Sequence, residues 1–77
     1  KEGYPMMREV SIHSFSQVQH LVSTACEYKE SVGVHDARGS IADAKSILGM
    51  MSLDFTRPVR IVADNESVLA DCVNAIH

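Results

Sequence analysis

The stretch Asp43-Ala44-Lys45-Ser46-Ile47-Leu48-Gly49-Met50-Met51-Ser52-Leu53 lies near the middle of the 77-residue chain. Its second half is rich in aliphatic and methionine side chains. Ser46 stands directly before this apolar run, where a hydroxyl oxygen can accept hydrogen bonds from the free amides of a first helical turn. The pattern ends at Thr56-Arg57-Pro58, because proline disfavours a helical conformation in the residue before it. The stretch therefore predicts a short helix over residues 46–53.

On the N-terminal side of this stretch the sequence predicts a strand and a longer helix. Residues 8–13 alternate between apolar and polar side chains, which is typical of a half-buried strand. Residues 16–28 place apolar side chains at helical spacing, which predicts an amphipathic helix that either Ser14 or Ser16 can cap. The apolar positions of this helix are Val18, Leu21, Val22, Ala25 and Cys26.

The remaining elements are predicted from alternation and from turn residues. Residues 31–35 and 40–42 read as two strands joined by the turn at residues 36–39, and residues 59–63 read as a further strand. Asp64 and Asn65 offer a cap for a closing helix that runs through Ile76. One face of that helix is apolar and carries Val68, Leu69, Cys72, Val73 and Ile76.

The predicted order is β-α-β-β-α-β-α, which favours an α+β open-faced sandwich. In such a fold the four strands form a mostly antiparallel sheet, and the three helices cover one of its faces. Residues 1–77 are expected to form one domain, because no linker, repeat or low-complexity tract interrupts them. Residues 1–7 are expected to be a loose N-terminal tail.

Composition excludes several classes of protein. Ten Asp and Glu against seven Lys and Arg give a net charge of −3, which argues against binding to nucleic acid. The longest apolar run, residues 47–51, is far shorter than the roughly 20 residues that span a bilayer. No secretory signal is visible, so a cytoplasmic location is expected. The two cysteines, Cys26 and Cys72, cannot form a disulfide framework and are both interpreted as buried thiols.

The segment over residues 45–53 closely resembles the signature of HPr, the histidine phosphocarrier of the bacterial sugar phosphotransferase system. That signature reads Lys-Ser-Ile-Met-Gly-aliphatic-Met-Ser-Leu, and here Leu48 and Met50 replace its first Met and its aliphatic residue. The segment Leu21-Val22-Ser23-Thr24-Ala25 is similar to the family's Leu-Val-Gln-Thr-Ala. The spacing between the two blocks and the predicted order of elements also agree with HPr.

The resemblance implies two functions for such a protein. HPr proteins accept a phosphoryl group from enzyme I on a histidine at the start of the first helix, and they pass it to IIA proteins. In many members, the serine that begins the short helix is phosphorylated by a dedicated kinase. A helix N-terminus favours an anionic group at both places, and a neutral imidazole can accept a phosphoryl group near pH 7. Neither function requires a cofactor.

The phosphoryl-accepting loop departs from the family pattern, which reads Gly-aliphatic-His-Ala-Arg-Pro. When the chain is aligned without gaps from Leu21, Ser14 occupies the position of the histidine, Ser16 that of the arginine and Gln17 that of the proline. When the first strand is aligned instead, the loop before the helix is about five residues too short. Both alignments predict that the loop has been shortened or rewritten.

His13 is the remaining candidate for a phosphoryl acceptor. It follows Ile12 as the family histidine follows an aliphatic residue, but no Arg or Lys lies between Arg8 and Lys29 to hold a phosphate. The alternative interpretation is a polar histidine at the end of a strand. The other three histidines, His20, His35 and His77, are scattered, so no zinc site is expected.

Ser46 and the helix after it are the other candidate sites. Ser46 is a candidate for regulatory phosphorylation, and the alternative is that it only caps the helix. Side chains of the same region are predicted to form a surface that contacts enzyme I, IIA proteins or an HPr kinase, or else to belong to the core. These candidate contact residues are Ile47, Leu48, Met51 and Phe55.

Three hypotheses for function follow. The first is an HPr-like binding or regulatory module that has lost its phosphoryl-accepting histidine. The second is a working phosphocarrier that accepts phosphate on His13. The third is a structural or oligomerising domain with the same fold. An independent enzyme is not expected, because Ser14 and Ser16 lack the Gly-x-Ser-x-Gly context of a serine nucleophile.

Overall fold

The computed structural model describes residues 6–77. Its four strands and three helices follow the predicted order β-α-β-β-α-β-α. The elements are β1 (Met6–Val10), α1 (Phe15–Cys26), β2 (Val32–His35), β3 (Ile41–Asp43), α2 (Ile47–Met50), β4 (Val59–Ala63) and α3 (Glu66–Ala75).

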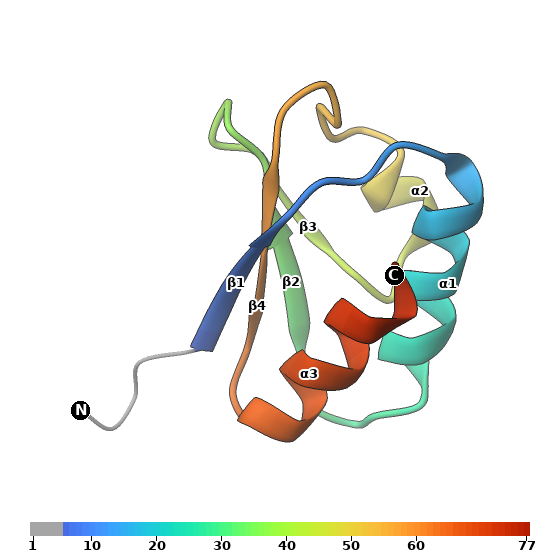
Figure 1. Cartoon of the computed structure of the whole chain (residues 1–77), viewed down its shortest axis with the longest axis vertical. Coiled ribbons are helices and arrows are strands. Elements are labelled where there is room, and N and C mark those ends of the chain that lie inside the picture. Colours follow the sequence, from blue (N-terminus) through green and yellow to red (C-terminus); the bar gives the residue numbers. More distant parts are fainter. Residues whose placement is uncertain (1–5) are drawn as a thin grey trace.

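The strands form one antiparallel sheet in the order β1-β4-β2-β3. The three helices lie against one face of this sheet and leave the other face uncovered (Figure 1). Strand β4 is central because it pairs with both β1 and β2, so the last strand in sequence joins the two halves of the sheet. The predicted α+β open-faced sandwich is confirmed.

Alternation along the strands decides which face carries the helices. In β4, Val59, Ile61 and Ala63 are buried, whereas Arg60 between them is exposed. The buried side chains of β4 pack with those of β2 and of the helices to form the core. Among the largest side chains with almost no exposure are Leu21 of α1, Met50 of α2 and Leu69 of α3. Each helix therefore contributes at least one large side chain to a common core.

The first strand differs from the prediction at both ends. It begins at Met6 and ends at Val10, so Met6 and Met7 belong to the sheet and not to a tail. Met6 pairs with Ala63 and Met7 with Val62, which shows that β4 is long enough to order them. The consecutive methionines break the apolar-polar alternation, so the pattern did not predict that the strand starts at Met6. The rest of the predicted tail, residues 1–5, lies outside the described residues.

The two cysteines have different environments. Cys72 of α3 is buried, as predicted, but the prediction for Cys26 is wrong because this residue is exposed at the end of α1. Both are free thiols. Burial raises the pKa of the Cys72 thiol above its ordinary value, and the nearby Asp71 carboxylate acts in the same direction. Of the two, Cys26 is therefore the accessible thiol.

Thiol titration should distinguish these environments. In the folded protein, Cys26 should react with Ellman's reagent on the order of 100-fold faster than Cys72, because Cys72 must wait for the structure to open. Both thiols should react at once in guanidinium chloride. The variant Cys26→Ser provides the control, since it should retain only the slow thiol. Two fast thiols in the native protein would contradict the buried position of Cys72.

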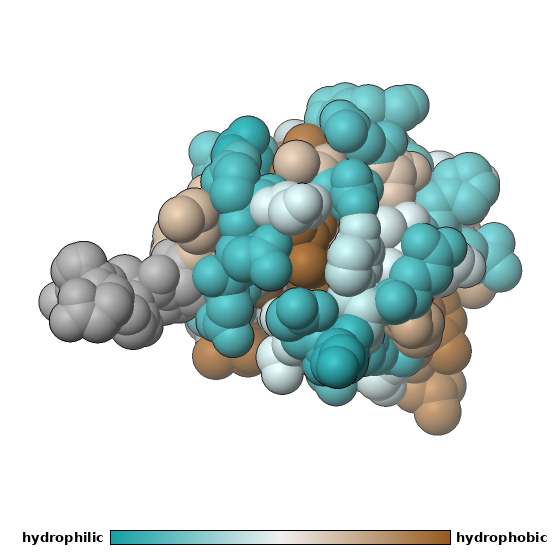
Figure 2. All heavy atoms as spheres, turned by 90° about the horizontal axis from the view of Figure 1, so that it is seen from below, coloured by the Kyte–Doolittle hydropathy of each residue, from teal (hydrophilic) through white to brown (hydrophobic). Residues whose placement is uncertain are grey.

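Two further features of the structure are the length of its helices and a polar end of the molecule. Within residues 6–77, no helix combines the length and the apolar character needed to cross a bilayer. The end where α1 stops and α3 starts is mostly hydrophilic, apart from a small central spot, and its larger hydrophobic areas lie at the margins (Figure 2). The exposed apolar side chains of α1 and α2 are described below.

Candidate functional site

The start of α1 is closed by a reciprocal pair of hydrogen bonds between Ser14 and Gln17. The Ser14 hydroxyl oxygen accepts a hydrogen bond from the Gln17 backbone N–H at 3.2 Å. In return, the Gln17 side-chain oxygen accepts from the backbone N–H groups of Ser14 at 3.1 Å and His13 at 2.6 Å. This capping box satisfies amides that a helix start otherwise leaves free. Ser14, which falls at the histidine position of the HPr pattern that the chain resembles, is the N-cap.

Gln17 also connects α1 to the end of the chain. Its side-chain nitrogen donates a hydrogen bond to the backbone oxygen of Ile76 at 2.9 Å, just beyond α3. A single carboxamide thus joins the loop before α1, the first turn of α1 and the end of α3. Proline at this position could form none of these side-chain hydrogen bonds. Comparison with the HPr pattern placed Gln17 at the position of a proline, but it did not predict this role.

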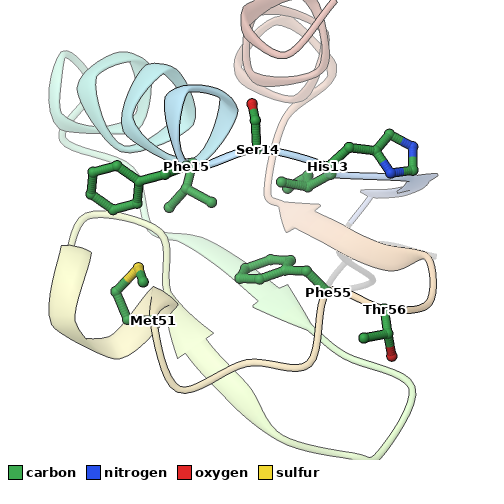
Figure 3. A pocket seen from close by; sticks show the side chains of 8 residues that line it. His13, Ser14, Phe15, Met51, Phe55 and Thr56 are labelled. Carbon is green, nitrogen blue, oxygen red and sulfur yellow. The ribbon is translucent and has the colours of Figure 1, made fainter.

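His13 lies just outside the capping box and its side chain is exposed. The imidazole points away from Phe15, and the Ser14 hydroxyl points in another direction (Figure 3). Arg8, the nearest cation in the sequence, pairs with Glu66 at the start of α3 at 2.9 Å. The structure therefore gives His13 access to solvent but does not bring it together with Ser14 as one reactive centre.

Ser46 caps α2, as the sequence predicted. Its hydroxyl oxygen accepts a hydrogen bond from the Gly49 backbone N–H at 3.0 Å, and the residue is exposed. The preceding Lys45 is oriented away from this cap, because its ammonium group donates to the backbone oxygen of Tyr28 at 2.6 Å. A Cβ atom on Gly49 would lie only 3.3 Å from the Ser46 hydroxyl oxygen, so glycine suits this close turn.

The predicted contact residues divide into two pairs. Leu48 is 82% exposed and Met51 is 54% exposed. Ile47 and Phe55 are partly buried and pack against the core, so the core interpretation holds in part for them. Sequence analysis missed Phe15, which is 50% exposed at the start of α1. Its position three residues before the buried Val18 extends the apolar stripe of α1, and this spacing was the available signal.

A cleft lies between the start of α1 and the segment that follows α2 (Figure 3). This cleft is mainly apolar, although His13, Ser14 and Thr56 also line it, and it has a volume of about 390 Å³. The side chains of Phe15 and Met51 stand at one side of it, and that of Phe55 lies at its centre (Figure 3). The buried side chains of Ile12 and Val18 also line it. The cleft can accept an apolar side chain from a binding partner.

A second, more polar hollow of about 460 Å³ lies on the other side of His13. Glu9, Gln17 and His77 line it together with His13. Within residues 6–77, however, no group of three or more His, Cys, Asp or Glu side chains is arranged to hold a metal ion. The remaining histidines, His20 and His35, lie on α1 and β2 and do not line either hollow.

The geometry therefore combines three features at one end of α1. These are an exposed histidine without a neighbouring cation in the sequence, a closed capping box and an apolar cleft beside exposed Phe15 and Met51. A comparison with protein-family models finds no match for this chain, and a comparison with the curated proteins finds none either.

Proposed function

We propose that this chain is an HPr-like protein of the phosphotransferase system that acts as a binding or regulatory module and not as a phosphocarrier. The Ser14–Gln17 capping box is the observation that carries this proposal. It occupies the positions where the family has its histidine and proline, and it uses the Gln17 oxygen to saturate two loop amides. The α+β sandwich and the segment at residues 45–53 support the family assignment.

Binding would use the exposed apolar side chains of α1 and α2. Phe15, Leu48 and Met51 expose about half or more of their surface, and two of them flank the apolar cleft. Methionine and aromatic side chains are enriched in protein interfaces because they adapt to a partner and bury much apolar area. By resemblance, the partners are enzyme I, IIA proteins or an HPr kinase, and the location is the cytoplasm.

Ser46 would supply regulation of this surface. Its hydroxyl group is exposed and lies two residues before Leu48. A phosphoryl group there adds a charge of about −2 beside an apolar surface, which opposes docking through desolvation. The same modification would also change the cap of α2, because the Ser46 oxygen accepts the Gly49 amide.

One observation favours the alternative of a working phosphocarrier. His13 is exposed directly before the N-cap of α1, so an incoming phosphoryl group can reach its imidazole. Against this alternative, the loop amide of His13 already donates to Gln17 at 2.6 Å, and Arg8 is paired with Glu66. The two functions make opposite predictions for transfer from enzyme I.

Incubation with enzyme I and phosphoenolpyruvate should leave the wild-type chain without acid-labile phosphate, while a standard HPr is labelled. The triple variant Ser14→His, Ser16→Arg, Gln17→Pro should gain acid-labile phosphate, because it rebuilds the family's acceptor beside an intact docking surface. Circular dichroism would establish that the variant is folded.

Two results would count against the proposal. Labelling of the wild type that disappears in His13→Ala would establish the phosphocarrier alternative. A folded triple variant that remains unlabelled, together with the absence of any chemical-shift change when the wild type is titrated with enzyme I, would remove the proposed docking function.

A further inference from the structure

Lys45, the residue before Ser46, contacts both the end of α1 and the end of β3. Its ammonium group donates a hydrogen bond to the backbone oxygen of Tyr28, just beyond α1, at 2.6 Å. Its backbone oxygen accepts one from the thiol of Cys26, the last residue of α1, at 3.7 Å. Its backbone N–H donates to the Asp43 carboxylate at 2.9 Å. These contacts hold the backbone before Ser46 in place, where the segment from β3 into α2 runs beside α1 (Figure 1).

The ammonium group of Lys45 is held by a neutral carbonyl and not by a carboxylate. Within residues 6–77 the salt bridge is that of Arg8 with Glu66, and Lys45 takes part in none. The helices on either side add no formal charge, because neither α1 nor α2 contains Asp, Glu, Lys or Arg. A hydrogen bond between two charged groups is stronger than one between an ammonium and a carbonyl. An anion within reach of this half-buried lysine would therefore compete with the carbonyl of Tyr28.

Phosphorylation of Ser46 would place such an anion on the next residue. A kinase replaces the hydroxyl proton with a phosphoryl group from a nucleoside triphosphate, which leaves a charge of about −1.5 to −2 and strong acceptor oxygens near pH 7. The Cα atoms of consecutive residues are about 3.8 Å apart, and the long, flexible lysine stem can turn back over that distance. Asp43, the other charged residue of this segment, would repel the phosphate. Lys45 is thus the cation of this segment that can compensate it.

We infer that Lys45 couples Ser46 to the end of α1: when Ser46 is phosphorylated, the Lys45 ammonium leaves the Tyr28 carbonyl and pairs with the phosphate. This inference rests on the proposed function, because it concerns the regulation proposed for Ser46. The coupling is an exchange of hydrogen bonds and forms no covalent bond. The Tyr28 hydroxyl group donates to the Asp71 carboxylate of α3, so the change extends from the start of α2 to the contact of Tyr28 with α3. Lys45 is a positioning residue in this coupling.

Nuclear magnetic resonance of chains with phosphoserine inserted at position 46 during translation tests this coupling without a kinase. Phosphorylation of the wild type should shift the carbonyl ¹³C resonance of Tyr28 in the same direction as Lys45→Met shifts it in the unmodified chain, because both changes remove the ammonium donor. In Lys45→Met, phosphorylation should cause less than about a quarter of the wild-type shift, since changes within one hydrogen-bond network are not additive. Lys29→Met is the matched control, because it removes the same charge from the exposed residue after Tyr28. It should keep the full shift on phosphorylation.

A Tyr28 carbonyl resonance that does not move when the wild type is phosphorylated would overturn the inference, and this comparison needs no variant to fold. Equal losses of the phosphorylation shift in Lys45→Met and Lys29→Met would overturn it as well. Treatment of the unmodified chain with an HPr kinase and a nucleoside triphosphate separates the inference from the proposed function. The predicted shifts in a chain that the kinase does not modify would keep the coupling and reject regulation by that kinase. Modification of Ser46 without a shift at Tyr28 would keep the regulation and reject the coupling.

Discussion

Replacing Met50 with alanine should lower the free energy of unfolding by about 2–5 kcal/mol, the range seen when a large buried side chain is truncated. Met50 has no exposed surface and lies in the core between α2 and the rest of the molecule. Alanine would remove three heavy atoms and leave a cavity in the core. Urea denaturation followed by circular dichroism would measure the change.

Met51 offers a control at the neighbouring position. Its side chain is 54% exposed, so Met51→Ala should change the free energy of unfolding by less than about 0.5 kcal/mol. The two substitutions remove the same atoms from adjacent residues, one buried at the end of α2 and the other exposed at its C-cap. Equal losses for the two variants would contradict the orientation of α2, because they would place both methionines at the edge of the core.

The contrast between Met50 and Met51 shows how far the sequence could predict this region. The capping serine and the apolar run predicted a short helix, and the structure has α2 at Ile47–Met50 with Ser46 as its N-cap. The pattern could not divide the side chains between core and surface, because a run of five apolar residues has no polar face to orient it. That division depends on contacts with β3 and α1, which are distant in sequence from each other.

The site at the start of α1 was predicted less completely. Comparison with the HPr pattern that the chain resembles placed Ser14 and Gln17 at its histidine and proline positions, and either Ser14 or Ser16 could have been the cap. The structure selects Ser14, because its hydroxyl group lies within hydrogen-bond distance of the Gln17 amide. The link from Gln17 to Ile76 spans 59 positions and has no local signature. The periodic pattern also could not predict that Cys26 is exposed, because this residue lies at the end of α1.

Asp36 has a structural role that the sequence did not predict. It was predicted only as part of a turn, yet it is the buried charged residue of the described chain, with 2% of its surface exposed. One carboxylate oxygen accepts hydrogen bonds from the backbone N–H groups of Arg38 at 3.0 Å and Ser40 at 2.8 Å. The other accepts from the Asp54 backbone N–H at 2.9 Å. Asp36 therefore joins the β2–β3 turn to the segment after α2, at the same end of the sheet (Figure 1).

Asp36→Asn should destabilise the protein strongly. A carboxamide keeps one acceptor oxygen and replaces the other with an NH₂ group, so at least one of the three backbone donors loses its acceptor. The melting temperature should fall by at least the roughly 4–8 °C that corresponds to one hydrogen bond in a domain of this size. Asp64→Asn is the control, since Asp64 is exposed beyond β4 and should tolerate the change. An equal melting temperature for Asp36→Asn and wild type would contradict the buried position of Asp36.

The effect of Asp36 should also depend on pH. The Asp54 backbone N–H, followed by those of Ser40 and Arg38, holds the pKa of the Asp36 carboxyl below its ordinary value of 3.8. Because this pKa is lower in the folded state, the unfolded state binds more protons, and stability rises with pH through this range. The contribution of the Asp36 carboxylate to stability is complete above pH 3.8, the ordinary pKa, and it is lost as the pH falls through the lower pKa of the folded state. The difference in melting temperature between wild type and Asp36→Asn should therefore be constant from about pH 5 to 7 and shrink below about pH 3.8. A difference in melting temperature that stays constant down to about pH 2 would mean that the charge of the Asp36 carboxylate does not stabilise the turn.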